Sequence, residues 1–219
     1  MTLRLQFVQL DVFATTRFLG NPLAIVHVPK EHAHLSQAQK QLDSPAAIDI
    51  FTVTEELPFA GHPTIGTGWY LLSKAPAVNA IILRTKAGDI PVVRDAPRVR
   101  LQVPIDFKVH EPYAHPNLKN VQPKLTDTDY FNGIHGVEVV ASIVKGMTFV
   151  LLQVASEDAL ARMQRYPERF KSDKLGEWGG FVGVYAFFER DDGVVRTRMF
   201  DGPLEDPATG SAASTLGGC

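Results

Sequence analysis

The segment Phe51-Thr-Val-Thr-Glu-Glu-Leu-Pro-Phe-Ala-Gly-His62 is the most informative part of the sequence, because the chain contains a second version of it. The second version, Phe200-Asp-Gly-Pro-Leu-Glu-Asp-Pro-Ala-Thr-Gly-Ser211, shares the pattern Phe-x4-Glu-x-Pro-x2-Gly followed by His or Ser. Each copy runs from strand-like residues through a Pro/Gly turn into small residues that predict a helix. The duplication predicts two halves of similar architecture. If the two turns face each other, the two helix starts frame one site.

The composition is that of an ordinary globular protein. The 219 residues, which suit one large domain or two smaller ones, are 45% hydrophobic and 21% charged, with a net charge of −2. A net charge of −2 does not indicate binding to nucleic acid or to an acidic membrane. No apolar run is long enough to span a bilayer. One cysteine, Cys219, excludes an internal disulfide. The N-terminus reads as a strand rather than a signal peptide, so we expect a cytoplasmic protein without nucleic-acid or membrane partners.

Alternating and β-rich runs predict strands in both halves of the chain. In the first half, strands are expected at 3–13, 23–28, 47–53, 80–85, 90–94 and 99–103, with helices at 31–41 and 64–73. In the second half, strands are expected at 137–144, 148–154, 182–189 and 194–200, with a helix capped by Ser156 and reaching about Tyr166. Pro112, Pro116 and Pro123 break regular structure between the halves. The pattern predicts lobes at 1–106 and 123–219 joined by a linker at 107–122.

Both repeated turns end at the start of a predicted helix. A helix start presents unpaired N–H groups and a partial positive charge, which suit a carboxylate or phosphate. Gly61 and Gly210 would let such a ligand approach the backbone. The small residues that follow each glycine are poor helix formers, which is explained if each helix is threaded tightly among strands. Taken singly, each segment could be a buried structural helix with an ordinary cap, but the duplication favours a site.

Two side chains at these turns carry possible proton chemistry. His62 is the only histidine in an apolar, glycine-flanked setting, and Asp206 lies in the second turn beside Pro207. Read alone, His62 could be a structural histidine and Asp206 a simple cap. An imidazole and a carboxylate flanking an anion pocket would instead suit proton removal next to a carboxylate or carbonyl. No dinucleotide-binding, P-loop or nucleophile-elbow motif occurs, and the other histidines lack metal-ligand spacing, so no cofactor or metal is expected.

These residues together resemble the phenazine-biosynthesis (PhzF-like) family of cofactor-independent isomerases, related in fold to diaminopimelate epimerase. The resemblance covers nearly the whole chain, and Glu205-Asp-Pro-Ala-Thr-Gly-Ser-Ala-Ala213 is its most specific motif. The other matching segments are Asp11-Val-Phe13, Gly20-Asn-Pro-Leu-Ala24, Pro58-Phe-Ala-Gly-His-Pro-Thr64 and Lys86-Ala-Gly-Asp-Ile-Pro91.

The resemblance implies an α+β (α/β) fold of two pseudo-symmetric lobes, each a curved, mostly antiparallel sheet wrapped around a central helix. It implies a homodimer and a small carboxylate substrate bound between the lobes. His62 and Asp206 match catalytic residues of the family. The backbone at Gly61, His62, Gly210 and Ser211 would bind the substrate carboxylate, and Asn21 is a weaker substrate-side candidate.

The chain departs from the family in two places. The family's main acid/base glutamate lies in a Ser-Glu-Thr-x-Phe-like motif before the first repeat, but no glutamate occurs between Glu31 and Glu55 here. Family members also continue well beyond the second central helix, which begins shortly before Cys219. We expect both to be missing pieces. Because loss of a principal base lowers the rate by ~10²–10⁴-fold, this chain would then show weak or no turnover while keeping carboxylate binding. The alternative is a catalytically silent, dimeric binding or scaffold protein.

Overall fold

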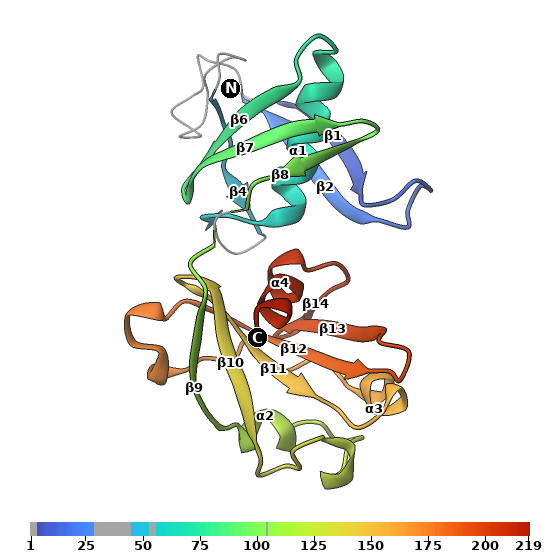
Figure 1. Ribbon diagram of the computed structural model, residues 1–219, viewed down its shortest axis with the longest axis vertical. Helices are drawn as coiled ribbons and strands as arrows, with labels where there is room; N and C mark the ends of the chain where they lie inside the picture. The colour runs from blue at the N-terminus through green and yellow to red at the C-terminus, as the bar shows by residue number, and fades with distance from the viewer. Residues whose placement is uncertain (1–3, 29–44, 53–55, 104) are drawn as a thin grey trace. The chain divides into compact units, whose positions relative to one another are not determined.

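The structure is a computed structural model that describes residues 4–28, 45–52, 56–103 and 105–219. The chain divides into two compact units, Met1–Pro104 and Ile105–Cys219. Each unit contains β-strands and a helix that packs against them (Figure 1). The α+β class expected from the sequence, with two sheet-containing halves, is therefore confirmed.

The first unit is built around the helix α1 (Gly61–Lys74), which contacts strands of both larger sheets of this unit (Figure 1). One sheet is an antiparallel ribbon, and another has four strands in the order β3-β6-β7-β8. The strands of the ribbon are β1 (Gln6–Val12) and β2 (Asn21–His27). The four-stranded sheet consists of β3 (Ala46–Ala47), β6 (Ala80–Thr85), β7 (Gly88–Asp95) and β8 (Arg98–Leu101). A short pair is formed by β4 (Ile50–Phe51) and β5 (Glu56–Leu57).

The small residues of α1 are required by close packing. A Cβ atom on Gly66 would lie 2.6 Å from Leu23 Cδ2 and 2.8 Å from Val12 Cγ2. A Cβ atom on Gly68 would lie 2.7 Å from Cγ1 of Val92, a fully buried residue of β7. The expectation that this helix is threaded among strands is confirmed, and its low intrinsic helix propensity follows from that packing.

We expect Gly68→Ala to lower the free energy of unfolding by about 1–3 kcal/mol, the usual effect of overpacking a core. The β-branched Val92 presents three atoms within 3.4 Å of the new methyl group and has little freedom to turn away. Gly217→Ala is the matched control, because a Cβ there meets no atom within 4 Å. That change should be neutral or stabilising by up to about 1 kcal/mol. Urea unfolding of both variants measures the difference. An unchanged midpoint for Gly68→Ala would show that the contact with Val92 can accommodate a methyl group.

The second unit contains a six-stranded sheet in the order β14-β13-β12-β11-β10-β9. The β11–β12 pair is parallel, and the other four pairs are antiparallel. The strands are β9 (Lys108–Ala114), β10 (Val137–Val144), β11 (Met147–Gln153), β12 (Phe181–Glu189), β13 (Val195–Asp201) and β14 (Leu204–Asp206). The helices are α2 (Pro116–Asn120), α3 (Glu157–Arg162) and α4 (Gly210–Gly218).

Alternate residues of this sheet point to opposite faces and build two cores. The helix α3 lies on one face against β12 and β13, and α4 lies on the other against β10 and β11 (Figure 1). The core on the α3 face includes Val150, Leu152, Val184, Phe200 and Leu160. The core on the α4 face includes Phe149, Leu151, Tyr185, Met199 and Ala212.

The segment 107–122, expected to link the halves, forms β9 and α2 inside the second unit. Its prolines occupy positions that regular structure tolerates. β9 is an edge strand, and Glu111 and Pro112 lie where its register against β10 shifts, between the pairs His110–Val140 and Tyr113–Glu138. Pro116 stands in the first turn of α2, where no intrahelical hydrogen bond is lost. The unit boundary falls instead between residues 104 and 105.

Other elements follow the sequence with shifted ends. The strand expected at 47–53 is divided between β3 and β4, and the expected helix at 31–41 lies outside the described residues. Ser156 caps α3 as predicted, because its Oγ accepts the N–H of Ala159 at 3.0 Å. The helix ends at Arg162 rather than near Tyr166, since Met163 has extended backbone angles. None of the helices within the described ranges is long and apolar enough to cross a membrane.

Candidate functional site

The two copies of the repeated motif form the same local structure. Phe51 pairs with Glu56 across β4–β5, and Phe200 pairs with Glu205 across β13–β14. In each copy the hairpin leads into a helix that begins at the glycine of the motif. The predicted strand–turn–helix repeat is therefore a hairpin followed by a helix.

The starts of α1 and α4 share several features. Neither N-cap residue, Ala60 nor Thr209, makes a side-chain capping bond, and neither first turn contains an acidic residue. A Cβ atom on Gly61 or Gly210 would meet no atom within 4 Å. Thr209 Oγ1 is buried and has no hydrogen-bond partner within the part of the chain that the structure describes. The N-cap residues of both helices therefore supply no side-chain acceptor to the first-turn N–H groups, which is a favourable setting for a carboxylate.

A buried threonine fixes the first turns of each helix from the inside. Thr64 Oγ1 donates to the carbonyl of Ala60 at 2.8 Å, and Thr215 Oγ1 donates to the carbonyl of Ser211 at 2.8 Å. Both threonines are fully buried. Their hydroxyl donors are satisfied within their own helices.

In the second unit, Asp206 and the start of α4 share one face of the sheet. Asp206 ends β14 opposite Met199, and cross-strand partners project to the same side. Met199 belongs to the core that packs against α4. Asp206 Oδ1 accepts the N–H of Ala208 at 3.0 Å, which forms a turn into the helix. The structure thus brings Asp206 together with Gly210 and the half-buried Ser211.

In the first unit, His62 and Asn21 occupy neighbouring elements. His62 is the second residue of α1 and is half-buried. Asn21 opens β2 opposite Val12 and is 6% exposed, and α1 contacts both β1 and β2. The roles of His62 and Asn21 as site residues stay predictions.

Two buried oxygens were not singled out from the sequence. One is Thr209 Oγ1 at the start of α4, and the other is Asp11 Oδ2, also without a hydrogen-bond partner among the residues described. The other oxygen of Asp11, Oδ1, accepts the N–H of Gly20 at 2.9 Å and closes the loop between β1 and β2. Phe13 and Phe18 in that loop are exposed and have φ of 65°, a strained value for a bulky residue. The segment Asp11-Val-Phe13 was recognised in the sequence, but the burial of Asp11 Oδ2 depends on packing and could not be predicted from it.

The glutamates of the two repeats are held in ion pairs. Glu56 lies 2.5 Å from Lys86, and Glu205 lies 2.7 Å from Arg198. The hydrogen bonds from Arg198 hold the pKa of the Glu205 carboxyl below its usual value. These ion pairs join Glu56 to the four-stranded sheet of the first unit and Glu205 to the neighbouring strand β13.

Other described histidines have structural contacts. His110 Nε2 lies 2.8 Å from Ser142 Oγ, and His27 Nε2 lies 3.3 Å from the Tyr70 hydroxyl. His115 is 3% exposed and packs edge-on against Phe170, and burial lowers its pKa to about 4. Across the described ranges, no group of three or more His, Cys, Asp or Glu side chains is arranged to hold a metal ion.

Comparisons with known proteins agree on one family. Residues 36–219 match the family model described as phenazine biosynthesis-like protein (PhzC-PhzF). An uncharacterized isomerase of Pasteurella multocida is 30% identical over 236 residues, which cover 95% of this chain and 74% of that protein. Trans-2,3-dihydro-3-hydroxyanthranilate isomerase of Pseudomonas aeruginosa is 26% identical over 239 residues, or 96% and 78% of the two chains. The crystal structure of a PhzF-family phenazine biosynthesis protein of Bacillus anthracis shares the fold, with a TM-score of 0.69, 20% identity, and coverage of 98% and 79%.

Proposed function

The chain belongs to the phenazine biosynthesis-like (PhzC-PhzF) family, and we propose that it is a cofactor-independent isomerase acting on a small carboxylate metabolite. Its relatives include isomerases. The observation that carries the proposal is the duplicated strand pair and helix, in which neither N-cap residue makes a side-chain capping bond. From the resemblance, the proposal also includes a homodimer in the cytoplasm.

In this proposal the helix starts bind the substrate carboxylate. The proposed backbone donors are the N–H groups at Gly210 and Ser211 in the second unit and those at Gly61 and His62 in the first. Thr209 adds its hydroxyl, and a bound carboxylate would give that buried oxygen the partner it lacks among the described residues. Preorganised donors of this kind stabilise charge that develops on the substrate during reaction.

Asp206 in the second unit and His62 in the first are proposed as proton-transfer residues, and Asn21 is proposed to orient the substrate. A proton leaves one carbon of the substrate, negative charge spreads toward the carboxylate, and a proton returns to a different carbon or to the other face. The electron pair stays within the substrate throughout, so the step needs no oxidant or reductant. The position of Asp206 on the same sheet face as α4 supports its part in this scheme.

A second candidate function is a catalytically silent binding protein of the same fold. The observation that favours it is the sequence between Glu31 and Glu55, which contains no glutamate and no Ser-Glu-Thr motif. In that case the helix starts would still bind a carboxylate, but no proton would move. Binding and proton exchange therefore have to be measured separately.

Solvent deuterium incorporation tests the isomerase directly. The purified chain is incubated in D2O for hours with trans-2,3-dihydro-3-hydroxyanthranilate and a panel of small amino and hydroxy acids, and mass spectrometry follows the acids. We expect one deuterium to enter a carbon position of at least one acid, even if turnover is slow. Methyl esters of the same acids are the control, because they lack the charge that the helix starts bind and should exchange little.

Two outcomes would contradict the isomerase. Calorimetric binding of the acids without any deuterium uptake would support the silent binding protein instead. Equal exchange of acids and esters would show that the helix starts do not select a carboxylate.

A further inference from the structure

We infer that Arg198 is a positioning residue for Asp206, because it ties the edge strand β14 to the C-terminal end of α3. The inference rests on the proposed function, in which Asp206 takes part in proton transfer. Arg198 itself is placed on the opposite side of the strand from Asp206 and would not touch the substrate.

The strand that carries Asp206 has little backbone support of its own. β14 has three residues, lies at the edge of the sheet and, among the described residues, pairs with β13 alone. It follows a tight turn at Gly202, whose φ is 56°. Short edge segments with few backbone hydrogen bonds open easily, so the orientation of Asp206 depends on further contacts.

Arg198 supplies such a contact with both sides of its guanidinium group. Its Nε and Nη2 donate to Glu205 Oε1 at 2.7 Å and Oε2 at 2.9 Å. Its Nη1 donates to the carbonyls of Leu160 and Met163, each at 2.9 Å. These carbonyls belong to the end of α3, where helix carbonyls lack intrahelical partners. The planar guanidinium group of Arg198, referred to below as its fork, therefore joins β14 to α3. A lysine ammonium could not make this set of contacts.

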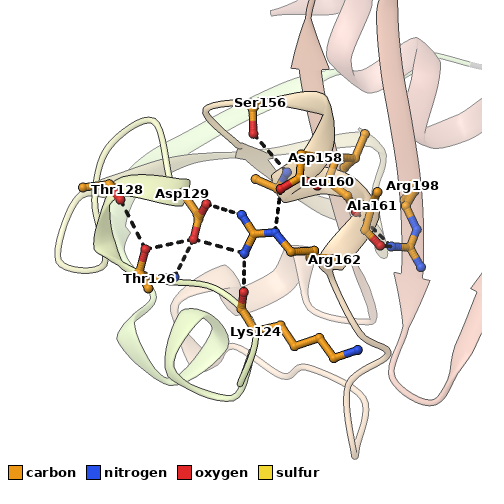
Figure 2. A network of polar contacts seen from close by, with 11 residues as sticks. Lys124, Thr126, Thr128, Asp129, Ser156, Asp158, Leu160, Ala161, Arg162 and Arg198 are labelled. Atoms are coloured by element: carbon orange, nitrogen blue, oxygen red, sulfur yellow. Dashed lines mark hydrogen bonds and ion pairs between the residues drawn. The ribbon is translucent and has the colours of Figure 1, made fainter.

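The helix α3 is itself fixed at this position. Figure 2 shows Arg162 of α3 reaching Asp129, with Nη2 2.5 Å from Asp129 Oδ1, while its Nε lies 2.7 Å from Asp158. Arg162 also donates to the carbonyl of Lys124. The polar network thus runs from the 3-10 turn containing Asp129, through α3, to Arg198 and on to Glu205.

The alternation of side chains explains how this contact can orient Asp206. Glu205 pairs with Phe200 and points to the α3 face, whereas the next residue, Asp206, points to the α4 face. A twist of β14 about its own axis would move both side chains together. Holding Glu205 therefore holds Asp206 without any contact between Arg198 and the reacting atoms.

A matched control lies two residues earlier on the same strand. Arg196 also contacts α3, with its Nε 3.4 Å from Glu157, but both side chains are more than half exposed. No contact joins Arg196 to β14 among the interactions of the described residues. Arg196→Lys should therefore reproduce the general effects of changing an arginine on β13 without loosening Asp206.

The first measurement is amide hydrogen exchange of peptides covering residues 203–209. Arg198→Lys keeps the charge but loses the fork, so we expect exchange there to become about tenfold faster, with Arg196→Lys unchanged. Unchanged exchange in Arg198→Lys, or equal acceleration in both variants, would show that Arg198 does not hold β14 in place. This measurement needs no activity. It therefore tests whether Arg198 holds β14 even if the wild-type chain moves no proton and the proposed function fails.

The second measurement is deuterium incorporation into trans-2,3-dihydro-3-hydroxyanthranilate, or into another acid on which the wild type acts. We expect Arg198→Lys to lower kcat by roughly 10–100-fold with little change in KM, because misplacement of a reacting group affects the chemical step. In an Asp206→Asn background the same change should have almost no further effect. Equal loss in both backgrounds would indicate general damage to the unit and would overturn the positioning role.

Discussion

Lys119→Met is expected to lower the free energy of unfolding by about 3–5 kcal/mol at pH 7, because it leaves a buried carboxylate without its cation. Lys119 Nζ lies 2.6 Å from Glu138 Oε1, and the side chains are 0% and 1% exposed. Lys119 also donates to the carbonyls of Gly133 at 2.5 Å and Gly136 at 3.1 Å. The ammonium thus connects α2 to β10 and to the turn before it, and its removal leaves several buried acceptors unpaired.

The loss should depend on pH in a defined direction. Burial raises the pKa of the Glu138 carboxyl, and the nearby Lys119 ammonium opposes that shift. In Lys119→Met the lowering effect of the ammonium is lost while the burial remains, so the folded-state pKa of Glu138 lies further above the unfolded value. Such a group binds its proton more readily in the folded state, and stability is gained as pH falls. The deficit of Lys119→Met relative to wild type should therefore shrink between pH 7 and about pH 5.

Two controls distinguish the effect of leaving the Glu138 carboxylate buried without a partner from the effect of removing a lysine. Lys119→Met combined with Glu138→Leu should recover most of the loss, because no unpaired charge remains inside. Lys145→Met breaks the pair with Glu177, whose side chains are 52% and 75% exposed, and should change stability by less than about 1 kcal/mol. Urea unfolding at both pH values provides the comparison. If Lys119→Met were as stable as Lys145→Met at pH 7, the buried pair would not contribute as argued.

Most of the fold was predictable because its signals are local. Alternation of apolar residues located the strands, and the repeat located the turn before each helix, although not the strand pairing of Phe200 with Glu205. The expected linker shows where local rules fail. Pro112 breaks an ordinary strand, but it is tolerated at a register shift on an edge strand, and the position of an edge is known only once the sheet is assembled.

The candidate site was predictable to a smaller extent. The helix starts at Gly61 and Gly210 follow from the repeat, since a turn and small residues are readable in the sequence. The buried hydroxyl of Thr209 and the fork of Arg198 depend on how distant segments pack. Arg198 joins residues near 160 to residue 205, and no spacing rule connects positions so far apart. The sequence between Glu31 and Glu55, where the family motif was expected, lies largely outside the described residues.

Asp206→Asn is expected to slow deuterium incorporation by roughly 10²–10⁴-fold relative to the unmodified chain, the usual effect of removing a general acid or base. The substitution is well suited to this position. Asp206 Oδ1 accepts the N–H of Ala208 at 3.0 Å, and an asparagine oxygen can accept the same bond. The turn into α4 should persist, and stability should change by less than about 1 kcal/mol. A large loss of rate in a stable protein would therefore show that Asp206 takes part in proton transfer and is not needed merely for folding.

The chain offers a close control for this change. Asp192 Oδ1 accepts the N–H of Val194 at 3.1 Å, which is the same bond to the second following residue, at the exposed β12–β13 turn. Asp192→Asn should leave both the exchange rate and the unfolding midpoint unchanged. Unimpaired exchange in Asp206→Asn would remove Asp206 from the proposed chemistry. Equal slowing in both variants would indicate a nonspecific effect of lost charge, because only Asp206 lies beside the helix start that is proposed to bind the substrate.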